Sequence, residues 1–258
     1  MKQVKLKIIE NNKIADKIYK MVLAGDTSAI TLPGQFIDLR LPEFFLRRPI
    51  SVSDFTDNSV TIIYKVLGQG TNLMTNLEPG TAIDALTGLG NGFDTSKSGS
   101  SPLLIGGGVG IPPLYKLAKD LLSEGKHANV ALGFNSKADS FYIDEFRTLG
   151  CEIKIASVDD TLGISGFATD AAKLFTPATY VYTCGPSKML KAVYEFCENE
   201  KISGEFSFEE RMGCGYGACM GCSTEVKELG KNKKPTGKII SKRICKEGPV
   251  LCKEEILW

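Results

Sequence analysis

Residues 1 to 98 carry short runs in which apolar and polar positions alternate, a period-two pattern typical of half-buried β-strands. Turn-forming residues separate the runs at positions 10–12, 25–26, 32–34, 57–58 and 78–80. The pattern predicts strands over residues 4–10, 18–23, 35–41, 50–53 and 59–66, with a short helix over 70–77. Many short strands at regular spacing indicate a β-barrel or a sandwich.

The pattern changes after a polar stretch at 94–101, where continuous apolar runs begin to alternate with helical periodicity. It predicts strands over residues 102–105, 129–133, 152–157 and 180–183. It predicts helices over residues 112–125, 140–149, 171–174 and 188–200. Alternating strands and helices favour a parallel, doubly wound α/β sheet. The last segment is rich in glycine and cysteine, then in lysine, so we expect three units over residues 1–98, 99–203 and 204–258.

Composition narrows the range of functions. The 31 Lys and Arg residues balance 30 Asp and Glu residues, and a net charge of +1 gives no reason to expect nucleic-acid binding. A single histidine leaves little material for a His-rich metal site or for Ser-His-Asp hydrolysis. The N-terminus has no apolar signal segment, and glycines and prolines break the most apolar window, residues 103–118. We therefore expect a cytoplasmic protein with no membrane association.

The strongest chemical signal is a group of cysteines near the C-terminus. Cys214, Cys219 and Cys222 have the spacing C-x4-C-x2-C, and Cys245 follows at a distance. This arrangement matches plant-type [2Fe–2S] ligation, and the glycines between the cysteines let the loop turn tightly around a cluster. A structural zinc site is the alternative, because a C-x2-C pair also binds zinc. Cys252 is a second candidate for the fourth ligand.

A glycine-rich turn and a second loop predict a nucleotide site in the α/β unit. Such a turn, between a predicted strand and a predicted helix, lets a phosphate approach the backbone at a helix N-terminus. The same glycines would also be found in a tight strand-to-helix turn that binds no phosphate. The second loop follows the last predicted strand, and ligands of open α/β sheets bind beyond the carboxyl ends of strands. The candidate residues are Gly106, Gly107, Gly108, Gly110, Cys184, Gly185 and Pro186.

A third signal opens a predicted barrel strand, at residues 47–51. Arg48 has the chemistry to pair bidentately with a diphosphate, and Ser51 can hydrogen-bond a ring nitrogen. An arginine pair before a strand is also typical of a solvated sheet edge, so this motif gains weight only together with the other two.

Together the motifs resemble the ferredoxin–NADP reductase family of flavoproteins. With the cysteine segment, the resemblance becomes close to the electron-transfer subunits of NAD-dependent (B-type) dihydroorotate dehydrogenases, and it covers essentially the whole chain. The segments that carry it are residues 47–51, 63–65, 70–71, 88–93, 106–113, 184–186, 209–214 and 245–250. The resemblance implies FAD bound to an N-terminal barrel, NAD bound to the α/β domain and a [2Fe–2S] cluster in the small C-terminal domain.

The same resemblance implies a reaction and a partner. An FMN-containing catalytic subunit would oxidise dihydroorotate in pyrimidine (UMP) biosynthesis. Electrons would then pass through the cluster and FAD to NAD+. The assembly would be a heterotetramer with two copies of each subunit.

Roles for individual residues also follow from the resemblance. Arg48 would hold the FAD phosphates, Pro49 and Ile50 would line the isoalloxazine, and Ser51 would bond near flavin N5. The glycine turn would pass the NAD diphosphate, and Cys184 would sit near the nicotinamide, so Ser51 and Cys184 are the expected catalytic residues. The flavin site would be completed by Ile63, Tyr64, Lys65, Gly70 and Thr71. The cluster would be held by Cys214, Cys219, Cys222 and Cys245.

Several alternatives stay open. Lys137 would suit a 2′-phosphate and Asp139 a 2′-hydroxyl, so these residues alone do not separate NADP from NAD. Related small subunits serve sulfide dehydrogenases and electron-bifurcating ferredoxin–NADP transhydrogenases. A zinc-stabilised nucleotide-binding regulator is a more distant alternative. The lysine-rich segment 227–238 predicts a long hairpin that is either solvated or in contact with an acidic partner surface.

Overall fold

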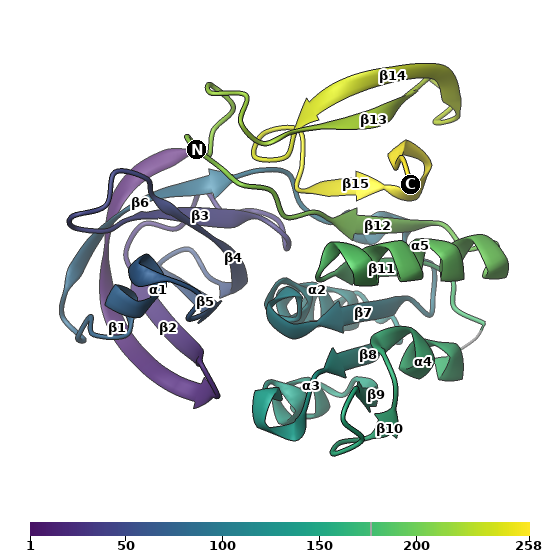
Figure 1. Ribbon diagram of the computed structural model, residues 1–258, viewed down its shortest axis with the longest axis horizontal. Helices are drawn as coiled ribbons and strands as arrows, with labels where there is room; N and C mark the ends of the chain where they lie inside the picture. Colours follow the sequence, from purple (N-terminus) through teal and green to yellow (C-terminus); the bar gives the residue numbers. More distant parts are fainter. Residues whose placement is uncertain (176) are drawn as a thin grey trace.

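The N-terminal strands close into an antiparallel barrel, as the alternating pattern predicted. The computed structural model describes residues 1–175 and 177–258. The barrel order is β1-β2-β5-β4-β3-β6, with the short helix α1 between β5 and β6 (Figure 1). The elements are β1 (Lys2–Ala15), β2 (Ile18–Ala24), β3 (Phe36–Arg40), β4 (Arg48–Phe55), β5 (Ser59–Lys65), α1 (Gln69–Met74) and β6 (Ala82–Leu89). Inward-facing aliphatic side chains such as Leu6, Ile37 and Ile62 are fully buried and fill the barrel.

Two features of the barrel differ from the sequence prediction. The turn expected at residues 10–12 is wrong, because β1 continues to Ala15. The Asn11 side chain explains why: its Nδ2 donates to the carbonyls of Met74 (2.8 Å) and Leu77 (2.9 Å), and its Oδ1 accepts the Tyr64 hydroxyl (2.9 Å). A turn-favouring residue is therefore held in a strand by partners far along the chain. The second difference is β6, which the prediction did not include.

The second unit is an α/β sheet of seven strands in the order β10-β9-β8-β7-β11-β12-β15. All neighbouring pairs are parallel except β12 with β15. The strands are β7 (Leu103–Gly107), β8 (Asn129–Phe134), β9 (Glu152–Ser157), β10 (Ile164–Ser165), β11 (Val181–Cys184), β12 (Gly204–Ser207) and β15 (Val250–Cys252). The helices are α2 (Pro112–Ser123), α3 (Ile143–Leu149), α4 (Ala168–Ala172) and α5 (Ser187–Glu200).

Helices cover both faces of this sheet, so the doubly wound prediction is confirmed. Leu104 packs with α2 and α3, whereas its neighbours Leu103 and Ile105 pack with α4 and α5. Successive residues of one strand point to opposite faces, and both faces here are dry. The central strand β7 is therefore a continuous apolar run.

The C-terminal segment combines sheet strands with a separate hairpin. β12 and β15 extend the α/β sheet, although we expected the third unit to begin at residue 204. The limits at 98 and 203 stay a prediction. The expected long hairpin is confirmed, with β13 (Ser223–Leu229) and β14 (Pro235–Arg243) projecting beyond β15 at the top of Figure 1. Across residues 1–175 and 177–258, no helix is both long and apolar enough to cross a membrane.

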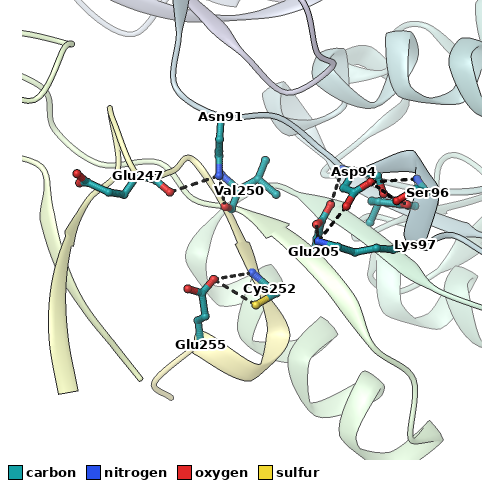
Figure 2. A network of polar contacts seen from close by, with 10 residues as sticks. Asn91, Asp94, Ser96, Lys97, Glu205, Glu247, Val250, Cys252 and Glu255 are labelled. Atoms are coloured by element: carbon teal, nitrogen blue, oxygen red, sulfur yellow. Dashed lines mark hydrogen bonds and ion pairs between the residues drawn. The ribbon is translucent and has the colours of Figure 1, made fainter. Parts of the chain in front are cut away.

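The barrel and the sheet are joined by direct contacts and by an ordered linker. Lys119 of α2 forms an ion pair with Asp54 of β4 at 2.9 Å. Farther along, Glu205 of β12 accepts the backbone N–H of Asp94 (2.8 Å) and the Lys97 ammonium (2.5 Å), as Figure 2 shows. Because Glu205 is 4% exposed, this ion pair fixes the linker to β12 from inside the protein.

Candidate functional site

The candidate flavin residues lie where two barrel strands separate. β4 pairs with β3 from Arg48 to Ser51, but the ladder that joins β4 to β5 covers only Val52 to Phe55 among the described residues. The first half of β4 therefore has no β5 partner, and the end of β5 has no β4 partner. Residues 48–51 and 63–65 lie on the two sides of this break, so the structure brings the predicted flavin segments together.

Contacts with neighbouring residues hold the Arg48 side chain at this break. Its guanidinium stacks on the Phe44 ring at 4.6 Å, and Nη1 donates to the Leu46 carbonyl at 2.6 Å. A Cβ on Gly70 would lie 2.6 Å from Nη2 and 2.7 Å from Cζ of Arg48, so glycine lets the first turn of α1 approach the arginine. In the hydrogen bonds of the described chain, Arg48 uses Nη1 alone. Its Nε and Nη2 are left to bind a phosphate bidentately.

The other predicted flavin residues differ in what they can offer. Pro49, Ile50 and Ser51 are half-buried in β4 at the break. By contrast, Ile63 is 3% exposed and Tyr64 1%, so each of these residues offers little surface to a flavin. Lys65 ends β5, and the Thr71 hydroxyl accepts the backbone N–H groups of residues 67 and 68, which orders the first turn of α1.

The glycine turn packs directly on the loop after β11. A Cβ on Gly110 would lie 2.5 Å from the Gly185 nitrogen, and closer still to the carbonyl group of Cys184. A Cβ on Gly185 would lie 2.9 Å from the Met189 sulfur. The backbones of two sheet loops thus touch at the carboxyl ends of adjacent parallel strands, where nucleotides bind in open α/β sheets. Pro112 begins α2 with its φ already helical and with no N–H to satisfy.

Cys184 is a neutral thiol at this edge. Burial raises its pKa to about 12, and the Ser207 hydroxyl, which hydrogen-bonds it, lowers the pKa by a smaller amount. A thiol with this pKa stays protonated at neutral pH, so it can pack beside an uncharged ring but does not act as a nucleophile. Val109 of the turn lies against the apolar cluster that includes Ile63 of the barrel. The nucleotide loop and the flavin strand therefore meet.

The four candidate cluster ligands form two pairs. The Cys214 sulfur accepts the backbone N–H groups of Ala218 (3.2 Å) and Cys219 (3.4 Å), and the Cys214 and Cys219 thiols hydrogen-bond each other. Cys245 donates its backbone N–H to the Cys222 sulfur at 3.4 Å, and these two thiols also hydrogen-bond. In the part of the chain that is described, no three His, Cys, Asp or Glu side chains converge as they would around one ion. Two pairs of thiols suit a cluster with two irons.

The two pairs have different environments. Burial tends to raise the pKa of Cys214, but backbone N–H groups donated to its sulfur outweigh that effect and lower the pKa to about 6. For Cys245, burial and the neighbouring Cys222 raise the pKa to about 12. Cys222 and Cys245 are each 2% exposed, whereas Cys219 is exposed. A cluster held here would have one side inside the protein and one side at the surface.

Cys245, rather than Cys252, is brought to the cluster loop. Cys252 ends β15, and its thiol donates to the Glu255 carboxylate at 3.2 Å. The structure therefore supports Cys245 as the fourth ligand. The remaining thiols, Cys151 and Cys197, are buried in the α/β unit.

The cluster loop rests on the barrel wall. A Cβ on Gly215 would lie 2.5 Å from Oδ2 of Asp38, and Asp38 is paired with Pro49 across β3 and β4. Asp38 is 2% exposed, and burial raises its pKa to about 7 against the opposing charge of Arg47. Arg243 donates from Nη1 to the Gly217 carbonyl at 2.7 Å, which ties the loop to the end of β14.

Sequence reasoning missed Asp38 and Arg243. A charged residue inside an apolar strand is the one signal that pointed to Asp38, whereas Arg243 is an ordinary basic residue in a basic hairpin.

Known proteins match both the cysteine segment and the whole chain. A family model described as the iron–sulfur cluster binding domain of dihydroorotate dehydrogenase B matches residues 209–257. A protein of Bacillus pumilus (strain SAFR-032), named dihydroorotate dehydrogenase B (NAD(+)), electron transfer subunit, is 40% identical over 99% of this chain and 98% of its own length. A protein of the same name from Listeria innocua serovar 6a is 38% identical over 99% of both chains.

Solved structures agree on the fold. The structure of an NADH-dependent reduced ferredoxin–NADP oxidoreductase, described for flavin-based electron bifurcation, superimposes with a TM-score of 0.82 and 28% identity. The match covers 98% of this chain and 90% of that one. Phthalate dioxygenase reductase has a TM-score of 0.66 and 18% identity over 93% of this chain and 76% of its own, which shows a shared fold.

Proposed function

Because the chain belongs to the family of dihydroorotate dehydrogenase B electron transfer subunits, we propose that it connects an FMN-containing catalytic subunit to NAD+. Electrons from dihydroorotate enter at the cysteine loop and leave at the glycine turn, with the barrel between them. The resemblance found in the sequence motifs is confirmed by these relatives over the full length of the chain.

One observation carries the proposed order of sites. Gly215 of the cysteine loop lies against Asp38, whose strand partner is Pro49 of the candidate flavin segment. The turn at residues 108–110 contacts β5, the strand that carries Ile63. The cluster loop therefore lies one strand away from residues 48–51, and the nucleotide loop touches the strand that carries residues 63–65, which supports a series of cluster, flavin and nicotinamide.

A carrier that exchanges both single electrons and hydride is needed between the cluster and the nicotinamide. The cluster carries single electrons, nicotinamide accepts a hydride, and FAD when bound exchanges both. The chain orients the cofactors: we assign Arg48 to the FAD phosphates and residues 49–51 to the isoalloxazine. The glycine turn and residues 184–186 hold NAD, and the neutral Cys184 thiol keeps charge away from the ring that gains or loses hydride. These residue roles rest on placement and on the family's motifs.

At the cluster end, the protein prepares a negative site before metal arrives. Backbone N–H groups aimed at the Cys214 sulfur favour its thiolate, which is the form that binds iron. The buried pair Cys222 and Cys245 faces the protein, and the exposed Cys219 faces outward. We propose that the partner subunit docks over the exposed side, because single electrons pass only between groups that lie close together.

The names of the relatives imply a catalytic partner, and we propose a heterotetramer with two copies of each subunit in the cytoplasm. Light scattering of the co-expressed pair gives the mass of the complex and tests the stoichiometry. We also propose that the three units described by residues 1–98, 99–203 and 204–258 serve FAD, NAD and the cluster in turn.

A second candidate is suggested by the bifurcating oxidoreductase that matches 98% of this chain. In that case the same three sites would serve a different catalytic subunit. The higher identity of the dihydroorotate dehydrogenase B relatives favours the first candidate.

The decisive experiment begins with the chain purified without oxygen. Assays for iron, acid-labile sulfide, flavin and zinc should give about two irons, two sulfides and one FAD per chain. With the FMN-containing subunit present, dihydroorotate should reduce NAD+. A colourless protein with zinc and no flavin would contradict the proposal, and cofactors without dihydroorotate-linked turnover would favour the second candidate.

A further inference from the structure

We infer that Asn91, in the linker between the barrel and the sheet, is a positioning residue that sets the distance between the flavin and the cluster. This inference rests on the proposed function, but it concerns a residue to which neither the sequence motifs nor the relatives assign a role. Figure 2 shows the Asn91 side chain reaching from the linker toward Val250 and the carbonyl of Glu247.

Asn91 makes four hydrogen bonds to one short segment. Its backbone N–H donates to the Gly248 carbonyl at 2.6 Å, and its Nδ2 donates to the carbonyls of Val250 (2.7 Å) and Glu247 (3.3 Å). Its Oδ1 accepts the backbone N–H of Val250 at 2.9 Å. A side-chain amide has the same donor and acceptor as a peptide group, so Asn91 pairs with both backbone groups of Val250 as a strand neighbour would.

The segment that Asn91 holds carries the fourth cluster ligand. Glu247 and Val250 follow Cys245 within five residues. The Glu247 carboxylate binds Arg243 through its backbone N–H (2.8 Å) and Nε (2.9 Å). Arg243 in turn donates to the Gly217 carbonyl of the cysteine loop. The segment is therefore fixed to the cluster loop on one side and to Asn91 on the other.

The linker is itself fixed to the barrel. The Gln35 side chain donates to the Gly90 carbonyl at 3.0 Å, and the Phe93 backbone N–H donates to the Pro33 carbonyl at 2.8 Å. A Cβ on Gly90 would lie 2.6 Å from Cδ of Pro249, so the linker touches the ligand segment without a side chain between them. A continuous set of hydrogen bonds thus runs from the barrel through Asn91 to the Cys245 segment.

This set of hydrogen bonds controls the distance between the barrel and the segment that carries Cys245. The rate of electron tunnelling between two centres falls exponentially with their separation, so a small displacement of one centre slows the transfer between them. None of the Asn91 bonds reaches a cysteine sulfur or the candidate flavin residues. Its loss should therefore change electron transfer between the centres while leaving their chemistry intact.

The test is Asn91→Asp in the cofactor-loaded chain. The carboxylate keeps the shape of the amide but places an oxygen opposite the carbonyls of Glu247 and Val250. After anaerobic mixing with NADH, we expect flavin reduction at the wild-type rate and cluster reduction several-fold slower. Iron and sulfide content and the midpoint potential of the cluster should not change. A purely structural role would lower cofactor content or stability without separating the two rates.

Two further variants complete the experiment. Glu247→Gln weakens the hold on Arg243 at the other end of the same connection, so it should slow the same step and decides the matter if Asn91→Asp loses its cluster. Asn129→Asp is the matched control, because its amide donates to Ser101 within the α/β unit, and it should leave both rates unchanged. Cluster reduction at the wild-type rate in loaded Asn91→Asp, or in Glu247→Gln, would overturn the inference. A wild-type protein without flavin reduction by NADH would instead contradict the proposed function.

Discussion

Replacing Gly110 by alanine tests the nucleotide site most directly. The added Cβ would lie 2.5 Å from the Gly185 nitrogen and nearer to the Cys184 carbonyl group, and all of these are backbone atoms. Carbon contacts are comfortable at about 3.5 Å, so the two loops must separate by about 1 Å. No side-chain rotation can relieve the collision. Overpacking of this kind costs about 1–3 kcal/mol of stability, which the folded protein can sustain.

The consequence should be confined to the nicotinamide step. The turn and residues 184–186 would no longer hold NADH in register with the flavin, and a displacement of about 1 Å can cost up to ~10²-fold in rate. We expect hydride transfer from NADH to FAD to slow ten- to a hundredfold, whereas FAD content and the cluster spectrum stay at wild-type levels. Anaerobic stopped-flow absorbance at several NADH concentrations separates the limiting rate from the affinity.

The control for general destabilisation is Gly125→Ala, just beyond the C-terminal end of α2. Gly125 has φ +77° and open space around its missing Cβ, so alanine there costs about 1–2 kcal/mol of backbone strain far from the loops. Flavin reduction in this variant should match the wild type. If Gly110→Ala is also reduced by NADH at the wild-type rate and affinity, the contact between the two loops does not shape the nucleotide site, and the reasoning fails.

Three more predictions concern the other sites. Gly70→Ala should displace the Arg48 guanidinium, which lies 2.6 Å from the new Cβ, and should lower FAD retention on gel filtration although the arginine is still present; full retention would argue against the phosphate role. Asp38 has a pKa raised from 3.8 to about 7 by burial, so the native state binds its proton more tightly than the unfolded chain does, and stability should fall as pH rises from about 4 to 7. Between pH 5 and pH 8, Asp38→Asn should remove up to about 3 kcal/mol of that dependence, seen as a smaller difference in Tm, and an unchanged difference would contradict it. Cys219→Ser should abolish the cluster spectrum and the dihydroorotate-linked reduction of NAD+, while NADH still reduces the flavin; turnover that survives would refute the electron route.

Local pattern predicted much of the architecture because the forces that form strands and helices are mostly local. Alternation gave five of the barrel strands, and continuous apolar runs gave β7 and β8. The failures occurred where a distant partner decided the outcome. Residues 10–12 favour a turn, yet Asn11 stays in β1 because α1 and Tyr64 use its amide. Asn11 also pairs with Met21 in the β1–β2 ladder, but the partners of its side chain lie 53 to 66 positions away.

The candidate site divides in the same way. The cysteine ligands were predicted because three of them, Cys214, Cys219 and Cys222, lie on one short loop, with numbers of residues between them that are typical of a [2Fe–2S] site. Arg48 and Gly70 were named together because the family's motifs contain both, and the structure supplies the reason: the missing Cβ lets the helix approach the guanidinium. Asn91 lies within segment 88–93 of the same motifs, but its role could not be inferred from them, since its partners lie 156 to 159 positions farther along the chain.

The contacts between units share a physical feature that bears on electron transfer. At Gly215 against Asp38, and at Gly90 against Pro249, two units meet backbone to side chain with no room for a Cβ. Both glycines have a positive φ, which accounts for the turn of the backbone at each position. The missing Cβ has a separate effect, because it lets the two units lie closer together. Alanine at Gly215 would separate the cluster loop from the barrel, and alanine at Gly90 would separate the Cys245 segment from the linker, while each cofactor's own ligands stay in place. Substitutions at these contacts should therefore slow transfer between centres with little loss of cofactor, whereas substitutions at Arg48 or Cys219 should remove a cofactor outright.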